Sequence, residues 1–127
     1  MKCDIFIEAL SQRVKVLEVT RQYEDQVTAL VELNDLPEAV RFLYYDKGGY
    51  LSTMVANDER GINKHYALYY VLSMEGGKMH KEDEIAQDEK CFVTVKVLVS
   101  PQTLTYPSVT PKVPACVWYE REAYDMF

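Results

Sequence analysis

The pattern that most restricts the fold of this chain is a run of valines at alternate positions: Val93, Val95, Val97 and Val99. A period of two places these side chains on one face of an extended strand, and the residues between them, such as Thr94 and Lys96, on the other. A strand with one apolar face is stable only in a sheet whose apolar face is covered by a second layer. The chain must therefore build at least one sheet with something packed on one side.

Apolar and β-branched residues predict further strands at about residues 14–20, 26–33, 50–56 and 64–73. Helical spacing is expected from Asp4 to about Gln12, at residues 35–43 and in the final segment 116–127. The central helix has the clearest signals, because Asp35 and Glu38 have the spacing of a capping box and Pro37 lies in the first turn. Gly48 and Gly49 are expected to end it.

These elements predict one α+β domain spanning residues 1–127, with helices packed on a mostly antiparallel sheet of about five strands and a helix at the carboxy terminus. The expected connections are a polar turn at 57–61, a long loop at 74–90 and a proline-rich connector at 101–114. No internal repeat or domain boundary is visible in the sequence.

The composition excludes several classes of protein. A net charge of −6 argues against a general binder of nucleic acid or anionic membranes, since both need a basic surface. The first eight residues carry Asp4 and Glu8 and do not form a secretory signal, and the longest apolar run, residues 67–72, is far too short to span a bilayer. Ten tyrosines are unusual, and such a surplus often serves surfaces where another protein binds.

No self-contained active site or metal site is expected. Cys3, Cys91 and Cys116 are odd in number and widely spaced, which predicts reduced, buried thiols in a cytoplasmic protein rather than a disulfide framework. His65 and His80 lack partners at metal-ligand spacing, and no phosphate-binding or nucleophile motif occurs. No residue of the chain is therefore expected to be catalytic or to bind a cofactor or a metal ion.

The last ten residues combine charged and large apolar side chains. Glu120, Arg121, Glu122 and Asp125 lie among Trp118, Tyr119, Tyr124, Met126 and Phe127. Arg121 and Asp125 have i,i+4 spacing and can pair on a helix. On composition alone, this segment suits either a terminal helix docked on its own core or an interface with a partner.

Residues 118–127, with the letters W-Y-E-R-E-A-Y-D-M-F, resemble the E-R-E-x-x-D-M-F signature of the respiratory-chain NADH dehydrogenase 30 kDa subunit family. This family comprises the 30 kDa subunit of complex I and its relatives in membrane-bound energy-converting nickel–iron hydrogenases and formate hydrogenlyases. Pro107-Ser108-Val109-Thr110 and Pro114-Ala115 stand at the family's usual distances before Trp118, and residues 51–58 are similar more loosely. The resemblance covers about residues 30–127, with Val113 and Val117 departing from the usual pattern.

The resemblance implies a non-catalytic accessory subunit of a membrane-associated electron-transfer complex. It would dock on and position the large catalytic subunit, next to a small iron–sulfur subunit, on the cytoplasmic face of the membrane. Iron–sulfur or nickel–iron centres would belong to those partners, with no cofactor in this chain. The complex I members of the family normally continue beyond the point corresponding to Phe127, so we expect a short hydrogenase-type member, with the NADH:quinone branch and a truncated chain as alternatives.

The expected partner interface consists of Trp118, Tyr119, Glu120, Arg121, Glu122, Asp125, Met126 and Phe127. The apolar members would anchor the contact and the charged ones would fix its register through ion pairs. An isolated chain could also form a homodimer through the unused interface. The alternative function is a free-standing enzyme or small-ligand-binding domain that uses the acidic, aromatic carboxy-terminal helix and the tyrosine-rich sheet as a pocket.

Overall fold

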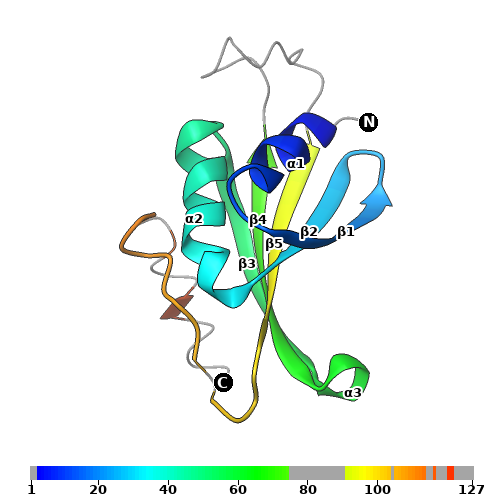
Figure 1. Ribbon diagram of the computed structural model, residues 1–127, viewed down its shortest axis with the longest axis vertical. Helices are drawn as coiled ribbons and strands as arrows, with labels where there is room; N and C mark the ends of the chain where they lie inside the picture. Colours follow the sequence, from blue (N-terminus) through cyan, green and yellow to red (C-terminus); the bar gives the residue numbers. More distant parts are fainter. Residues whose placement is uncertain (1–2, 75–90, 104, 114–115, 117–119, 122–127) are drawn as a thin grey trace.

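In the part of the chain that the structure describes, the sheet has five strands in the order β1-β2-β5-β4-β3, so the strand latest in sequence lies at its centre (Figure 1). The computed structural model describes residues 3–74, 91–103, 105–113, 116, 120 and 121. The strands are β1 (Val16–Tyr23), β2 (Gln26–Val31), β3 (Tyr50–Glu59), β4 (His65–Met74) and β5 (Cys91–Val99). The pairs β1–β2, β3–β4 and β4–β5 are antiparallel and β2–β5 is parallel, which confirms the predicted α+β domain with a mostly antiparallel sheet.

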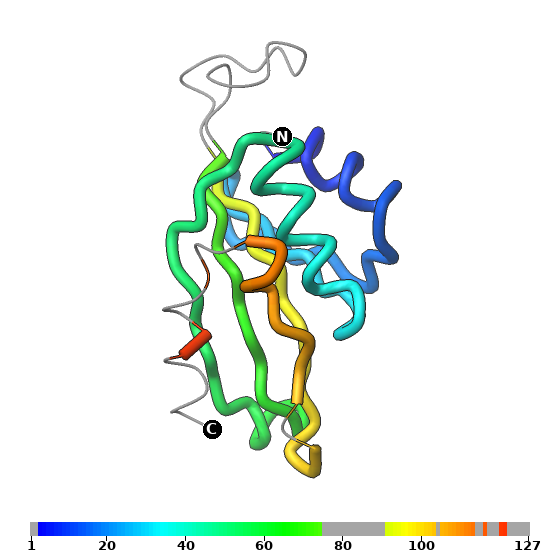
Figure 2. The backbone as a smooth tube through the Cα atoms, turned by 90° about the vertical axis from the view of Figure 1, so that its left-hand side faces the viewer, coloured from blue at the N-terminus to red at the C-terminus, as the bar shows by residue number. Residues whose placement is uncertain are grey.

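Helices α1 (Asp4–Ser11) and α2 (Leu36–Arg41) lie on one face of this sheet (Figures 1 and 2). The single turn α3 (Arg60–Asn63) lies at the tip of the β3–β4 hairpin. A 3-10 turn (Leu33–Asp35) precedes α2 and a π-helical turn (Phe42–Asp46) follows it. Because α1 and α2 cover the same face, the opposite face carries no helix from the described residues.

The alternating valines behave as predicted. Val93, Val95, Val97 and Val99 are fully buried on the helix-covered face. Leu68, Tyr70 and Leu72 of β4 lie beside them, also fully buried. Val109, Val113 and Cys116, which follow β5, extend the same core, so this segment packs on the sheet next to α2.

Two local predictions around α2 differ in outcome. Gly48 adopts φ 70°, as expected of a glycine after a helix, and a Cβ at Gly49 would lie 2.6 Å from Met74 Sδ. The capping box does not form, because Asp35 makes no side-chain cap hydrogen bond. Glu38 instead accepts a 2.6 Å hydrogen bond from Arg41 Nε, and this ion pair uses the carboxylate that the box required.

The polar turn predicted at 57–61 is too early by a few residues. β3 continues to Glu59, because Asn57 and Glu59 pair in register with Ala67 and His65 of β4. The chain then reverses through α3, and the residue that caps its carboxy-terminal end, Lys64, adopts φ 65°. Asn57 and Asp58 are therefore exposed residues of a strand, and Glu59 a buried one, rather than members of a loop. The predicted loop at 74–90 falls, after Met74, outside the described residues.

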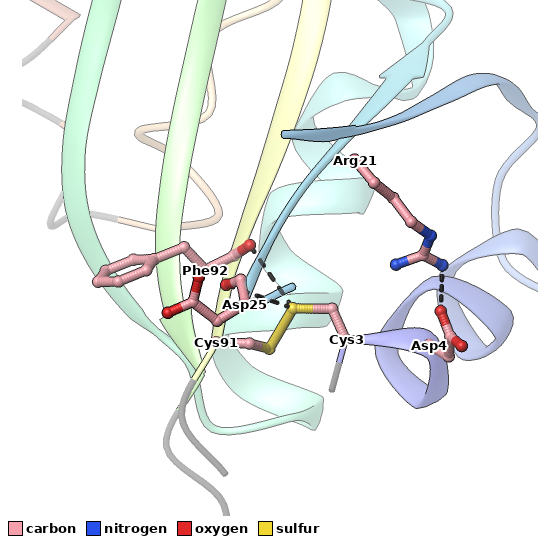
Figure 3. The surroundings of a disulfide bond; sticks show 6 residues. All are labelled: Cys3, Asp4, Arg21, Asp25, Cys91 and Phe92. Atoms are coloured by element: carbon pink, nitrogen blue, oxygen red, sulfur yellow. Dashed lines mark hydrogen bonds and ion pairs between the residues drawn. A yellow bond between two sulfur atoms is a disulfide. The ribbon is translucent and has the colours of Figure 1, made fainter. Parts of the chain in front are cut away.

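The prediction of three reduced cysteines is wrong for two of them. Cys3 and Cys91 form a disulfide, with their Cα atoms 5.9 Å apart, although 88 positions separate them in the sequence (Figure 3). The start of α1 packs against the start of β5, and such a contact between distant segments leaves no local sequence pattern. Cys116 is a free, buried thiol, as predicted.

Candidate functional site

A buried carboxylate connects the signature segment to the rest of the domain. Glu120 is 7% exposed and accepts hydrogen bonds from the hydroxyl of Tyr70 at 2.7 Å and the hydroxyl of Ser108 at 2.8 Å. The backbone N–H groups of Val109 and Thr110 donate to it at 3.0 and 2.9 Å, and the Thr110 hydroxyl donates as well. We call this group, Tyr70, Ser108, Val109, Thr110 and Glu120, the glutamate clasp.

The local sequence prepares one side of the glutamate clasp. Ser108 Oγ accepts a 3.2 Å hydrogen bond from the Thr110 N–H, and the Val113 N–H donates to the Val109 carbonyl oxygen at 2.8 Å. This compact turn directs consecutive backbone N–H groups to one point, an arrangement that binds anions. The buried side chains of Val109 and Val113 attach the turn to the core. The turn is therefore a preformed donor site for the Glu120 carboxylate.

The clasp holds Glu120 in its charged form with uncharged donors. Burial alone would raise the pKa of Glu120, but the hydrogen bonds from Thr110, Val109, Tyr70 and Ser108 outweigh it and hold the pKa below its usual value. Burial and the nearby Glu120 charge raise the pKa of Tyr70 well above its usual range. The same two causes raise the pKa of Tyr106 and of the Cys116 thiol to about 12 each. At neutral pH Cys116 is thus a protonated thiol and a poor nucleophile.

Of the predicted interface residues, the structure describes Glu120 and Arg121. Glu120 points into its own domain, whereas Arg121 is exposed. Trp118, Tyr119, Glu122, Asp125, Met126 and Phe127 lie outside the described residues.

The connection between the P-S-V-T segment and Glu120 was not predicted from the sequence, although both belong to the family pattern. Tyr70 was expected on a strand and was not among the predicted site residues. The sequence did contain a signal for this connection: a carboxylate in an aromatic segment follows a turn that is rich in hydroxyl groups.

A second buried carboxylate lies on the opposite, helix-free face of the sheet. Glu59 is 6% exposed and accepts hydrogen bonds from Asn63 Nδ2 at 2.9 Å, Asn57 Nδ2 at 3.2 Å and the Tyr69 hydroxyl. Lys96 Nζ lies 3.4 Å from Glu59 Oε1 and 5.3 Å from the centre of the Tyr69 ring. Burial would raise the pKa of Glu59, but these hydrogen bonds and the Lys96 charge lower it. We call these five residues the Glu59 cluster.

The remaining residue types that could take part in catalysis or bind a metal ion have structural roles here. His65 begins β4, where its backbone N–H donates to Asn63 Oδ1 at 3.0 Å. Among the described residues, no group of three or more His, Cys, Asp or Glu side chains is placed to hold a metal ion. No helix in the described part of the chain is long and apolar enough to cross a membrane. The glutamate clasp and the Glu59 cluster can hold chain segments in place, and that is the chemistry their geometry supports.

The fold and the glutamate clasp define a class of protein: a small α+β domain with a half-covered sheet and a carboxy-terminal segment fixed by an internal carboxylate. The chain belongs to the family described as "Respiratory-chain NADH dehydrogenase, 30 Kd subunit", whose model matches residues 29–127. That match includes the P-S-V-T segment and the whole of the carboxy-terminal signature. The predicted family membership is confirmed.

Two relatives from Escherichia coli (strain K12) are similar over 112 residues, or 88% of this chain. Formate hydrogenlyase subunit 5 is 52% identical and hydrogenase-4 component G is 48% identical. The chain spans only 18% of the length of each relative. Their names confirm that the resemblance extends to the hydrogenase branch of the family.

Solved structures show the same fold. The trypsin-resistant fragment of Nqo5 matches with a TM-score of 0.74 at 17% identity, covering 100% of this chain and 92% of that one. A chain of the membrane-bound sulfane sulfur reductase, an archaeal respiratory membrane complex, matches with a TM-score of 0.69 at 15% identity, covering 100% of this chain and 68% of that one. At such low identity these matches establish the architecture alone.

Proposed function

We propose that this chain is a non-catalytic accessory subunit of a membrane-associated electron-transfer complex of the energy-converting hydrogenase type. In this proposal it docks on the large catalytic subunit and holds it in a fixed position, next to a small iron–sulfur subunit. The redox centres belong to these partners, and the assembly lies on the cytoplasmic face of the membrane. Membership of a family of respiratory-chain subunits and the names of the two Escherichia coli relatives support this assignment.

The observation that carries the proposal is the glutamate clasp. Its donors come from β4 and from the 108–110 turn, so the start of the E-R-E-x-x-D-M-F signature is fixed relative to the sheet. Arg121 is the next residue and is exposed. A docking segment that starts from a fixed point loses less conformational freedom on binding and transmits a defined geometry to its partner. The signature thus divides into an internal anchor, Glu120, and a docking part that begins at Arg121.

Arg121→Ala tests the docking role. A guanidinium that pairs with a buried carboxylate of the partner is worth about 2–5 kcal/mol of association, much of it the cost of leaving that carboxylate unpaired. The tagged complex is recovered from native membranes with each chain in turn, and the amount of large subunit retained is measured by quantitative mass spectrometry.

Lys15→Ala serves as the matched control, because Lys15 is an exposed basic residue between α1 and β1, away from the signature. We expect Lys15→Ala to retain the partner as wild type does and Arg121→Ala to lose most of it. Unchanged recovery with Arg121→Ala would contradict a docking role for this residue. Failure of the wild-type chain to bring down any redox subunit would contradict the proposed function as a whole.

A further inference from the structure

The helix-free face of the sheet has an unusual composition for a surface open to water. Helices α1 and α2 both cover the other face (Figure 2). Strand register places the following side chains on the helix-free face of the three inner strands: Gln26, Thr28 and Leu30 of β2; Phe92, Thr94, Lys96 and Leu98 of β5; Ala67, Tyr69, Val71 and Ser73 of β4. Only Lys96 in this set is charged, although 27% of the whole chain is charged. When one face of a sheet is in water, the side chains along each strand normally alternate between apolar on the buried face and polar on the solvated one. The mixture of apolar and uncharged polar side chains on this face is instead the composition of an interface.

A trough crosses this face. Its larger part has a volume of about 430 Å³, with Val55, Tyr69 and Phe92 as apolar walls and Gln22, Thr28 and Thr94 as uncharged polar walls. A smaller hollow of about 140 Å³ shares Gln22, Thr28 and Tyr69 with it and extends to Lys96 and to the exposed Glu18 of β1. The trough therefore runs over all five strands, from Val55 on β3 to the outer strand β1.

The larger part of the trough is lined by uncharged side chains, and the one cation of its smaller part is paired. Lys96 is paired with Glu59 at 3.4 Å, and the remaining donors around Glu59 are the amides of Asn57 and Asn63 and the Tyr69 hydroxyl. The threonine hydroxyls and glutamine amides can form hydrogen bonds with the backbone groups of a partner, while valine and the aromatic rings can pack against an apolar side chain. A charged occupant of the larger part would lose its hydration without gaining an opposite charge, because Glu18 and Lys96 line only the smaller hollow. The walls of the larger part thus favour an uncharged occupant.

We propose that this trough is a second docking surface, which receives an uncharged, convex segment of the large partner polypeptide, with an aliphatic or aromatic side chain seated beside Val55 and Phe92. The inference rests on the proposed function and adds to it a surface on the sheet, separate from the signature. The relatives point to polypeptide as the occupant: in each, the part matched by this chain is 18% of a much longer protein. Each relative therefore has further chain beside this unit, and the described helices α1 and α2 leave this face for such chain to cover.

Two other occupants fit the trough less well. A second copy of this chain would place the same patch on both sides of a twofold axis, so hollow would face hollow and the apolar walls would remain unfilled. A small molecule would need a site that encloses most of its surface and a few convergent polar groups to orient it. The trough is open along a sheet face, and the buried carboxylate of Glu59 beside it already accepts hydrogen bonds from its own chain.

Val55→Glu tests this inference in the assembled complex. Val55 is 46% exposed, so a glutamate there can reach water in the isolated chain but places a charge on the wall of the trough when the partner is bound. Ile62→Glu is the matched control, because Ile62 is a β-branched aliphatic residue of α3 that is 86% exposed and lines neither part of the trough. Circular dichroism and thermal melting of each purified variant establish that the fold is retained.

We expect Val55→Glu to lower the large subunit recovered from native membranes by about tenfold or more, and Ile62→Glu to leave it unchanged. A photo-crosslinking benzoylphenylalanine at position 55 should give a covalent product with the large subunit, identified by mass spectrometry, and the same probe at position 62 should not.

Three outcomes would each overturn the inference: full recovery with Val55→Glu, a crosslink from position 55 to a second copy of this chain, or a small molecule retained on the chain in native mass spectrometry. If Arg121→Ala weakens the complex and Val55→Glu does not, this inference fails while the proposed function stands.

Discussion

The two buried glutamates lie on opposite faces of one sheet and are held in different ways. The described donors to Glu120 are uncharged, and they come from β4 and from the 108–110 turn, ten or more positions away in the sequence. Two donors to Glu59, Asn57 and Asn63, lie within four positions of it, and Lys96 supplies a positive charge. Glu120 therefore joins segments that the chain brings together only when folded, while Glu59 stabilises its own hairpin and joins it to β5.

This comparison predicts that loss of the two carboxylates differs in cost. Glu120→Ala leaves hydroxyls and N–H groups of a buried site without an acceptor, so we expect it to lower the free energy of unfolding by about 3–5 kcal/mol. Glu59→Ala should cost only about 1–2 kcal/mol, because Lys96 and the asparagine amides can turn to water. Urea denaturation of the two variants measures the difference.

Glu8→Ala, on an exposed position of α1, is the control for removal of a glutamate and should stay within about 0.5 kcal/mol of wild type. Equal losses of unfolding free energy for Glu120→Ala and Glu59→Ala would show that the glutamate clasp stabilises the fold no more than the Glu59 cluster does.

The stability of the folded chain at low pH should depend on the charge of Glu120. The pKa of Glu120 is lower in the folded chain than its ordinary value of 4.5, so its contribution to stability is fully present above pH 4.5 and is lost as the pH falls through the lowered pKa. Glu120→Gln removes this dependence, and the variant should show a flatter stability profile below about pH 5. The loss of stability is smaller than in Glu120→Ala, because the amide oxygen still accepts hydrogen bonds. A profile identical to that of wild type would contradict ionisation of Glu120 in the folded state.

The smallest expected difference concerns neighbouring tyrosines of β4. Tyr70→Phe removes the hydroxyl that donates to Glu120 from a fully buried position and should cost about 1.5–3 kcal/mol. Tyr69→Phe removes the corresponding hydroxyl on the partly exposed face and should cost about 0.5–1.5 kcal/mol. Each tyrosine variant is the control for the other, since both lose one hydroxyl from adjacent positions. Thermal melting suffices to rank them, and a reversed order would reject the assignment of the stronger site to the helix-covered face.

The parts of the structure that depend on local periodicity were predictable from the sequence. The valines of β5 and the two sides of β4 face as their alternation required, because burial on one face of a sheet allows a single register. The end of β3 was placed too early, since polar residues on a solvated strand resemble a turn. The Cys3–Cys91 disulfide and the connection of Glu120 to Tyr70 were missed, because each joins segments 50 or more positions apart.

The candidate site was predicted in one respect only. The last ten residues were singled out correctly as a family signature, yet composition could not distinguish a glutamate that binds a partner from one that binds its own chain. That distinction depends on the 108–110 turn, whose N–H groups converge only after Val109 and Val113 have entered the core. Arg121, the next residue, is exposed, and the predicted partner interface stays a prediction that the recovery of the complex with Arg121→Ala tests.

The central place of β5 has a consequence for how the chain is made. Two hairpins, β1–β2 and β3–β4, are completed early in synthesis, but each has an inner edge that pairs only with β5. Until Cys91–Val99 leaves the ribosome, both hairpins expose unpaired backbone groups and apolar faces, the state in which nascent sheets associate with the wrong neighbour. Insertion of β5 joins the halves through one parallel and one antiparallel ladder at once. The sheet therefore emerges from the ribosome as two incomplete halves. A chaperone that protects their exposed edges and apolar faces would act mainly before residue 99 has emerged.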